Sequence, residues 1–207
     1  MPSLVLDPRW RRRIRSSHRD ALLRRGVSPG ALRWSSRETQ ERRFQVLFGL
    51  GIRPGDRLLD VGCGFGDLAA WLESRGCPVA YTGIDITPEL LEEGRRLYPH
   101  LDLREGELFE LDPSPESFDW VVLSGALNDE LRDGGDHARR LILRMWEACS
   151  QGIAFNLLDA RHRPTAECWS LQSFQPMEMR DFVVGFAPRV ELRDDYLEND
   201  FTVLAWR

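Results

Sequence analysis

The chain has no lysine: all 28 cationic side chains among its 207 residues are arginines. Schiff-base catalysis, a lysine general base and a Walker-type phosphate loop each need a lysine, so these classes of enzyme are excluded. The 33 acidic side chains give a net charge of −5. A domain that binds nucleic acid is usually basic, so this balance argues against nucleic acid as a partner.

Cysteines are few, and long apolar runs are missing. Cys63, Cys77, Cys149 and Cys168 form neither a CxxC pair nor a secretory framework, which predicts reduced thiols and no metal site. No run approaches the ~20 apolar residues that span a bilayer, and the N-terminus lacks the apolar core of a signal peptide. We therefore expect a cytoplasmic protein with no membrane partner.

Two helices are expected before residue 50. The first, Arg9 to Arg25, carries the run Arg11 to Arg13, which is either a solvated helix face or a contact for an anionic partner such as RNA; the acidic balance favours the solvated face. The second begins at the capping box Ser35 to Glu38 and ends at Gly51. We expect one domain, 1–207, with residues 1–50 as a helical lid and 54–207 as its core.

Strands and helices alternate through the rest of the chain. Strands are expected at 57–61, 79–85, 102–105, 120–124 and 153–158, with helices at 67–74, 88–98 and 136–149. This alternation predicts right-handed crossovers and a parallel sheet covered on both faces. After a helix at 177–186, the short stretch between strands 190–193 and 201–206 requires an antiparallel pair.

A glycine-rich turn follows the first strand directly. Gly62, Gly64 and Gly66 allow backbone conformations that bring main-chain N–H groups close to a ligand. A dinucleotide site would need another glycine where Asp67 stands, and this carboxylate would repel a pyrophosphate. Asp85, at the end of the second strand, can accept hydrogen bonds from both hydroxyls of a ribose. The pattern favours a zwitterionic or cationic nucleoside ligand.

Four segments in this order resemble the motifs of class I S-adenosylmethionine-dependent methyltransferases. They are Asp60–Gly66, Gly83–Ile86, Glu105–Leu108 and Phe118–Ser124, and the likeness extends from about Ser35 to the end of the chain. The resemblance implies an α/β, Rossmann-like fold. Its sheet would have seven mostly parallel strands in the order 3-2-1-4-5-7-6, with helices on both faces and an antiparallel last strand.

The resemblance also implies a cofactor, S-adenosyl-L-methionine, with S-adenosyl-L-homocysteine as product. The expected cofactor-binding residues are Trp34, Arg43, Asp60, Gly62, Cys63, Gly64, Gly66, Asp67, Asp85, Ile86, Glu107, Leu108 and Ser124. Asp60 and Asp67 would lie near the methionine ammonium, Asp85 at the ribose and Ile86 against the adenine. Arg43 could pair with the methionine carboxylate and Glu107 with the adenine amino group; a solvated surface position is the open alternative for both.

The acceptor is expected beyond the carboxyl ends of the fourth and fifth strands. Expected catalytic residues are His162 and Asn128, and expected substrate contacts are Asn128, Asn156, Trp169 and Tyr196. Of the four histidines, His18, His100 and His137 are expected to lie away from these strand ends. The long segment 160–175 is expected to form part of a substrate lid.

The segment after the fourth strand reads Ser-Gly-Ala-Leu-Asn (124–128) rather than the Asn/Asp-Pro-Pro-aromatic tetrad of base-modifying relatives, so nucleobase methylation loses support. The resulting prediction is methyl transfer to the oxygen or nitrogen of a small molecule. Methylation of a protein or RNA, or a catalytically silent accessory that binds the cofactor, stays open as an alternative. A monomer and a homodimer are both open.

Overall fold

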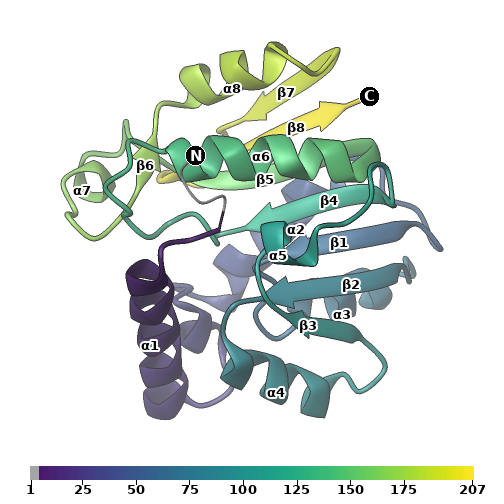
Figure 1. Cartoon of the computed structure of the whole chain (residues 1–207), viewed down its shortest axis with the longest axis vertical. Coiled ribbons are helices and arrows are strands. Elements are labelled where there is room, and N and C mark those ends of the chain that lie inside the picture. Colours follow the sequence, from purple (N-terminus) through teal and green to yellow (C-terminus); the bar gives the residue numbers. More distant parts are fainter. Residues whose placement is uncertain (1–4) are drawn as a thin grey trace.

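The computed structural model describes residues 5–207. A single sheet runs through the molecule with helices on both faces (Figure 1). Its strands are β1 (Arg57–Val61), β2 (Ala80–Asp85), β3 (Asp102–Glu105), β4 (Phe118–Ser124), β5 (Cys149–Asp159), β6 (Ser173–Phe174), β7 (Arg189–Arg193) and β8 (Asp200–Trp206). The helices are α1 (Pro8–Arg25), η1 (Pro29–Leu32), α2 (Arg37–Phe48), α3 (Asp67–Ser74), α4 (Pro88–Leu97), α5 (Leu108–Leu111), α6 (Asp136–Ala148), α7 (Arg163–Ala166) and α8 (Pro176–Val184).

The sheet has the predicted topology. Its strand order is β3-β2-β1-β4-β5-β8-β7; β1 to β5 pair in parallel, and β8 runs antiparallel to both β5 and β7. This confirms the expected order 3-2-1-4-5-7-6. The two-residue strand β6, which pairs with the end of β5, was not predicted, because two residues carry no periodic signal.

The core consists of two apolar layers, one on each face of the sheet. Helices α6 and α8 cover one face, where Met145 and Met179 are fully buried. Helices α2 and α3 cover the other, where Leu47 and Leu72 are fully buried. Covered faces on both sides explain why strands such as β4 read as continuous apolar runs.

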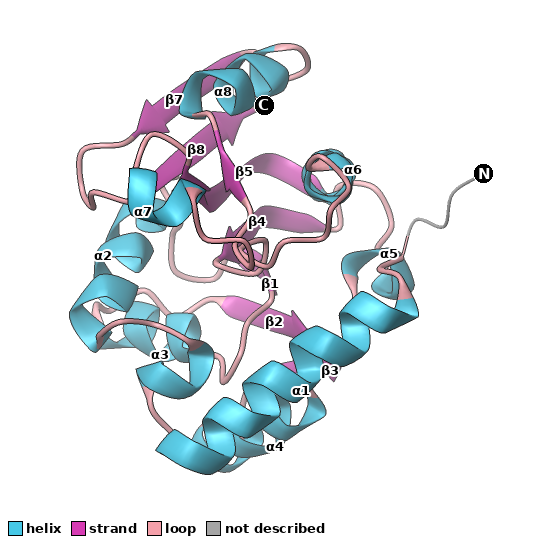
Figure 2. Ribbon diagram, turned by 90° about the vertical axis from the view of Figure 1, so that its left-hand side faces the viewer, coloured by secondary structure: helices cyan, strands magenta, loops and turns pink. Residues whose placement is uncertain are grey.

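The strand order reverses between β1 and β4, since β2 and β3 extend to one side and β5 to the other. In open α/β sheets such a reversal leaves a crevice at the carboxyl ends of the strands. The loops after β4 and β5 lie between α1 and α7 in Figure 2, on this side of the sheet. None of the helices within residues 5–207 has the length and apolar character needed to cross a bilayer.

Candidate active site

A cavity of about 330 Å³ opens at the carboxyl ends of the parallel strands. Its floor comes from the ends of β1, β2 and β4, and its other walls come from α1, η1, α2, the start of α6 and the segment around β6. Elements far apart in the sequence therefore enclose one space. The volume is in the range of small-molecule and cofactor sites.

The glycine loop presents its backbone to this cavity because side chains would not fit. Gly62 and Gly64 have φ angles of 76° and 57°, which disfavour any residue with a Cβ. A Cβ on Gly64 would also lie 2.7 Å from the side chain of Leu32 in η1, and one on Gly62 would collide with Ala126 after β4. The loop is therefore packed between two other segments, with its main chain lining the cavity.

Gly66 and Asp67 were expected beside the cofactor, but they do not line the cavity. A Cβ on Gly66 would meet Leu101 and Leu103 on the side of β3. Asp67 accepts hydrogen bonds from Nε2 of Gln40 and from the hydroxyl of Tyr98, both at 3.0 Å. Since its oxygens tie α3 to α2 and to the end of α4, Asp67 holds the elements together. The structure corrects the expectation that it lies near an ammonium group.

Asp85 lies in the cavity wall at the end of β2 and also braces the glycine loop. One carboxylate oxygen accepts the N–H of Gly64 at 3.0 Å, and the other accepts the N–H of Thr87 at 2.8 Å. These bonds fix the carboxylate at the end of the strand. Each oxygen keeps a lone pair for a ligand hydroxyl.

Asp60 is a buried carboxylate in the same wall, with only 3 % of its surface exposed. Its Oδ2 accepts the hydroxyl hydrogen bond of Tyr81 at 2.6 Å, whereas Oδ1 has no hydrogen-bond partner among residues 5–207. Burial raises the pKa of Asp60 to about 7, and the hydrogen bond from Tyr81 opposes that rise. A cation bound in the cavity would stabilise the charged form.

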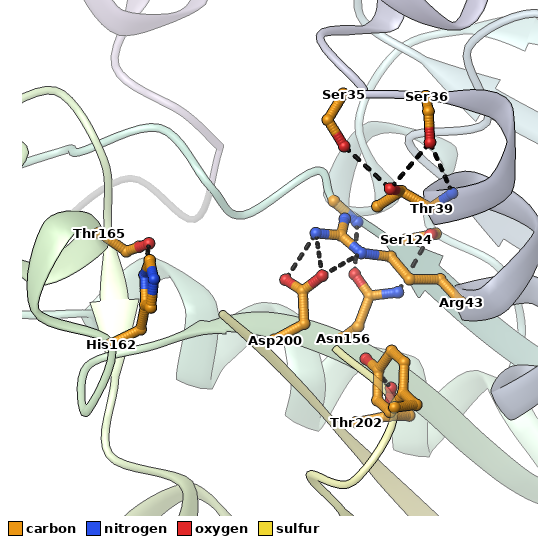
Figure 3. Close-up of polar contacts among 12 residues, drawn as sticks. Ser35, Ser36, Thr39, Arg43, Ser124, Asn156, His162, Thr165, Asp200 and Thr202 are labelled. Carbon is orange, nitrogen blue, oxygen red and sulfur yellow. Dashed lines mark hydrogen bonds and ion pairs between the residues drawn. The ribbon is translucent and has the colours of Figure 1, made fainter. Parts of the chain in front are cut away.

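Arg43 lines the cavity from α2 and is held by two neighbours. Its Nε and Nη2 donate to the two carboxylate oxygens of Asp200, at 2.7 and 2.5 Å, and its guanidinium carbon lies 4.2 Å from the ring centroid of Trp34. Figure 3 shows Arg43 and Asp200 facing each other beside Asn156. The remaining nitrogen, Nη1, is buried without a partner within the described part of the chain.

Glu107, the residue that precedes α5, also lines the cavity. Its Oε2 accepts the N–H of Leu6 at 2.8 Å, and Oε1 lies 3.5 Å from Nη1 of Arg11. Burial raises the pKa of Glu107, against the effects of these two neighbours. Four other expected cofactor residues, Cys63, Ile86, Leu108 and Ser124, also line the cavity.

The segment 160–175 reaches the cavity because it docks on the loop after β4. The N–H of Gln172 donates to the carbonyl of Asn128 at 2.9 Å, and the N–H of Glu130 donates to the carbonyl of Ser170 at 3.1 Å. Leu171, Gln172 and Phe174 thereby join Asn128 in the wall. Asn128 was expected there; Gln172 was not, since nothing local in the sequence distinguishes it.

Two of the predicted acceptor residues lie away from the cavity. His162 directly precedes α7, where its Nδ1 lies 2.7 Å from the hydroxyl of Thr165, and Figure 3 shows this pair well apart from Arg43. Trp169 is 77 % exposed. Neither side chain lines the cavity, because α7 directs this part of the segment outward. These two expectations are wrong in their placement.

Asn156 and Tyr196 are also placed differently from the prediction. Asn156 is fully buried on β5; its Oδ1 accepts the N–H of Gly125 at 2.9 Å and its Nδ2 donates to Ser124 at 3.1 Å. Tyr196 shares a 2.8 Å hydrogen bond with Thr202. Neither lines the cavity, so Asn156 supports the floor from below and Tyr196 packs behind it.

Two histidines expected elsewhere line the cavity instead. His18 reaches it from α1 and His137 from the first turn of α6. Gly135 is the residue that precedes α6, and the carboxylate of Asp133 accepts the N–H groups of Gly135 and His137 at 2.9 and 2.8 Å. Both histidines were missed because only the tertiary arrangement places these helices over the strand ends.

The arginine-rich part of α1 contacts the protein itself. Arg11 donates to Glu110 at 2.6 Å, Arg13 donates to the carbonyl of Glu130 at 2.8 Å, and Arg15 lies 3.4 Å from Glu105. Within the run Arg11 to Arg13, Arg12 is exposed and the other two arginines are partly buried. The expected solvated face is therefore largely a contact face.

The sheet order and the glycine loop define the fold of class I S-adenosylmethionine-dependent methyltransferases. A family model described as a methyltransferase domain matches residues 58–152, from β1 into β5. The match covers a little less than half of the chain, and the matched residues include the glycine loop, Asp85 and Asn128.

Sequence relatives cover the chain in part. A 2-phytyl-1,4-naphtoquinone methyltransferase of Trichormus variabilis is 28 % identical over 155 residues, which are 70 % of this chain and 63 % of the relative. A demethylmenaquinone methyltransferase of Staphylococcus aureus is 33 % identical over 91 residues, which are 42 % of this chain and 38 % of the relative. The chain thus spans less than two thirds of the length of either relative.

A solved structure matches over nearly its whole length. The magnesium protoporphyrin IX methyltransferase of Synechocystis, crystallised with S-adenosylmethionine, superposes with a TM-score of 0.67 over 99 % of both chains, at 16 % identity. At that identity the likeness establishes the shared fold.

Proposed function

We propose that the chain is an S-adenosylmethionine-dependent methyltransferase that methylates an oxygen or nitrogen of a small molecule. The observation that carries this proposal is the continuity of the cavity from Asp85 and the glycine loop to an apolar end beyond β4. The names of the relatives support it, since naphthoquinone, demethylmenaquinone and magnesium protoporphyrin IX are all small ring compounds.

The residues present fit the cofactor. Asp60 offers an unpaired carboxylate oxygen and Arg43 an unpaired guanidinium nitrogen in one cavity. Buried charges normally have partners, and a methionine moiety carries the two complementary charges, an ammonium and a carboxylate. The two atoms without partners therefore match an ammonium and a carboxylate, a pair that a nicotinamide dinucleotide does not carry.

We assign the remaining contacts by position. The carboxylate of Asp85 would accept the ribose hydroxyls, while Ile86 and Leu108 would pack against the adenine and Glu107 would face its polar edge. Gly62 and Gly64 would contact the methionine part through their backbone. Asn156 would act indirectly by holding the N–H of Gly125.

The chemistry needs alignment more than functional groups. When bound, the cofactor supplies a methyl group on a positively charged sulfur. The chain would hold the acceptor in line with that methyl group and keep water out, and alignment of this kind lowers a barrier by roughly 7–11 kcal/mol. An acceptor hydroxyl also needs a proton acceptor, whereas a neutral amine does not.

We also propose that residues 1–50 form a lid on a core of residues 54–207. Segments from Leu6 to Phe44 contribute to the cavity wall, which supports this division. A cytoplasmic location and the choice between a monomer and a homodimer stay predictions from the sequence.

The alternative of a protein or RNA substrate was based on the arginines of α1. Because Arg11 and Arg13 bind Glu110 and the backbone of Glu130, they are poorly disposed to bind a polyanion. A silent accessory that binds the cofactor would keep the same cavity, so only turnover distinguishes it from an enzyme.

Calorimetry with S-adenosylhomocysteine tests the cofactor assignment. We expect the chain to bind it and Asp85→Asn to weaken binding tenfold or more, because a ribose hydroxyl would lose its charged acceptor. Asp102→Asn changes a carboxylate on β3, outside the cavity, and should bind like the native chain. Binding of a nicotinamide dinucleotide without binding of S-adenosylhomocysteine would overturn the proposal.

Transfer of labelled methyl groups to a panel of ring hydroxyls and amines tests turnover. Methylation of any of them supports an enzyme acting on small molecules. Methylation of a protein or RNA from a lysate, with none of the panel turned over, would instead support the macromolecular alternative.

A further inference from the structure

The end of the cavity beyond β4 is an apolar chamber. Its walls come from the loop after β4, the start of α6 and the docked segment before α8, and they include Leu127, Leu131, Ala138, Leu141, Leu171 and Phe174. In Figure 2 these segments lie near α6, on the side of the molecule that carries α1 and α7. Such walls suit an apolar ring or chain.

Two amide oxygens in this chamber have no partner. Oδ1 of Asn128 and Oε1 of Gln172 are buried without a hydrogen bond from any described residue. The backbone hydrogen bond from Gln172 to Asn128 places the two residues side by side. Nε2 of Gln172 donates to the carbonyl of Ser173 at 3.3 Å, which sets the direction of that amide. Buried acceptors of this kind require a donor, and a ligand would supply it.

The charged side chains around this chamber already have hydrogen-bond partners within the protein. Nη1 of Arg33 donates to Asp129 at 2.8 Å, and the carboxylate of Asp133 accepts the N–H groups of Gly135 and His137. An anionic acceptor molecule would find no free cation among these groups, because Arg33 is bound to Asp129. The chamber therefore favours a neutral molecule that donates hydrogen bonds.

His137 is a further titratable group in the wall of the cavity. Neither of its ring nitrogens makes a hydrogen bond among residues 5–207, and its ring meets that of Phe109 edge to face with centroids 6.3 Å apart. Burial lowers the pKa of His137; Arg140 acts in the same direction and Asp133 opposes it. The imidazole is therefore neutral at pH 7 and can accept a proton.

We propose that the chamber binds a neutral, apolar ring compound through a hydroxyl group, which donates its hydrogen bond to Asn128 or Gln172 on binding and then turns to His137, which takes the proton as the oxygen is methylated. This inference rests on the function proposed above and adds to it the acceptor class and the general base.

The step balances. The acceptor oxygen forms a bond to the methyl carbon, and the bond from that carbon to the sulfur breaks with its electron pair on sulfur. The hydroxyl proton moves to a ring nitrogen of His137 and then to water. The chain returns to its starting state, with a methyl ether and S-adenosylhomocysteine as products.

Binding of a matched pair of probes tests the chamber. In the presence of saturating S-adenosylhomocysteine, fluorescence titration should show that 1-naphthol binds at least tenfold more tightly than naphthalene, because only the naphthol donates a hydrogen bond. The double variant Asn128→Leu, Gln172→Met should lose this preference while still binding naphthalene. Equal affinity of the native chain for the two probes would show that the chamber assignment is wrong.

Methyl transfer tests His137. Transfer to 1-naphthol should rise with pH to a plateau reached near neutrality, and His137→Gln should reduce the neutral-pH rate about 100-fold and abolish the plateau. Transfer to 1-naphthylamine, a neutral amine, should change far less. His100→Gln, which alters an exposed histidine paired with Glu73, is the matched control and should keep the native profile.

The outcomes separate this inference from the proposed function. Naphthol binding without turnover, or an unchanged pH profile in His137→Gln, would overturn the role of His137. Calorimetry of S-adenosylhomocysteine on the same variant checks that the fold and the cofactor end are intact. Failure of the native chain to bind S-adenosylhomocysteine would remove both proposals.

Discussion

Two buried charges of opposite sign, Asp60 and Arg43, face the cavity with incomplete partners. Asp60 accepts one hydrogen bond from Tyr81, and two of the three guanidinium nitrogens of Arg43 donate to Asp200. An ionised carboxylate without a full set of partners is costly in a buried site. A cavity that keeps such charges gives up stability for the binding of a charged ligand.

The first prediction follows from the pKa of Asp60. Its folded pKa of about 7 exceeds an unfolded value of about 3.9. Below the unfolded pKa both states hold the proton and the group costs nothing; above it the unfolded state loses the proton first, so stability falls as the pH rises and the loss is complete above pH 7. Asp60→Asn should raise the free energy of unfolding by about 1–3 kcal/mol at pH 8, and by less at pH 5.

Denaturant unfolding at both pH values measures this difference. The same variant should bind S-adenosylmethionine at least tenfold more weakly at pH 8, because an ammonium would lose its countercharge. A variant that gains no stability at pH 8 relative to pH 5 would show that Asp60 is not a strained carboxylate.

The second prediction concerns the ion pair between Arg43 and Asp200, both less than 5 % exposed. Asp200→Asn leaves the guanidinium buried without a charged partner, so the free energy of unfolding should fall by about 3–5 kcal/mol. Asp195→Asn removes a partner from the exposed Arg193 and serves as the control, with stability close to native. Equal losses in the two variants would contradict the buried pair.

At the scale of elements, α1 is attached to the rest of the molecule through polar contacts and one small apolar cluster, in which Leu22 packs against Ala31, Phe65 and Leu90. Arg11, Arg13 and Arg15 each bind a different segment, while Ala21 is the buried residue of the helix. Few buried apolar contacts are typical of elements that open at low free-energy cost. This composition suits a lid.

The third prediction compares adjacent arginines of α1. Arg11 pairs with Glu110 at 2.6 Å and lies 3.5 Å from Glu107, whereas Arg12 is exposed and makes no ion pair within residues 5–207. A partly exposed pair contributes about 0.2–1 kcal/mol, so Arg11→Gln should speed amide hydrogen exchange in α1 roughly 1.5- to 5-fold by that principle. Arg12→Gln should leave the exchange rate of α1 unchanged. Equal acceleration by both variants would show that the ion pair of Arg11 does not hold α1 in place.

Secondary structure follows the sequence closely where an element belongs to the regular alternation of strands and helices. The bounds predicted for β1, α3 and β3 are those observed, because apolar runs, glycine turns and helix starts are local signals. The missed elements are η1, α5, α7 and β6, all of four residues or fewer. Segments this short have too few residues for a periodic pattern, and their conformation depends on what they dock against.

At the scale of the whole molecule, cofactor binding should stabilise the entire fold, since residues of α1, η1 and α2 and the strand ends line one cavity. At a concentration one hundred times its Kd, a ligand adds about 2.7 kcal/mol, which for a chain of this size corresponds to a Tm increase of roughly 5–10 °C. S-adenosylhomocysteine should produce this increase. Differential scanning calorimetry measures it, and Asp85→Asn at the same concentration should reduce it.

This fourth prediction also has a pH dependence. Because the ammonium of the ligand prefers ionised Asp60, and that group has a pKa of about 7 in the free chain, the Tm increase should be smaller at pH 5.5 than at pH 8 at one fixed ligand concentration. A Tm increase that is independent of pH would show that Asp60 does not bind the ammonium group of the ligand.

Local sequence determined the strand and helix order, the fold class and the cofactor end of the cavity. Gly62, Gly64 and Asp85 stand at the turn and the strand end that we propose to bind the cofactor, and a motif of adjacent residues carries that information. Parallel strands with helical crossovers then leave one sheet order that brings these residues together.

Only the tertiary structure decided the acceptor end. His137 and Gln172 carry no local signal, and Asn156, His162, Trp169 and Tyr196 have suitable chemistry but lie under, behind or outside the cavity. Their positions depend on how α6 and the segment 160–175 pack over the strand ends, through contacts such as the one from Gln172 to Asn128. Long-range packing sets such contacts, and the residues that make them are far apart in the chain.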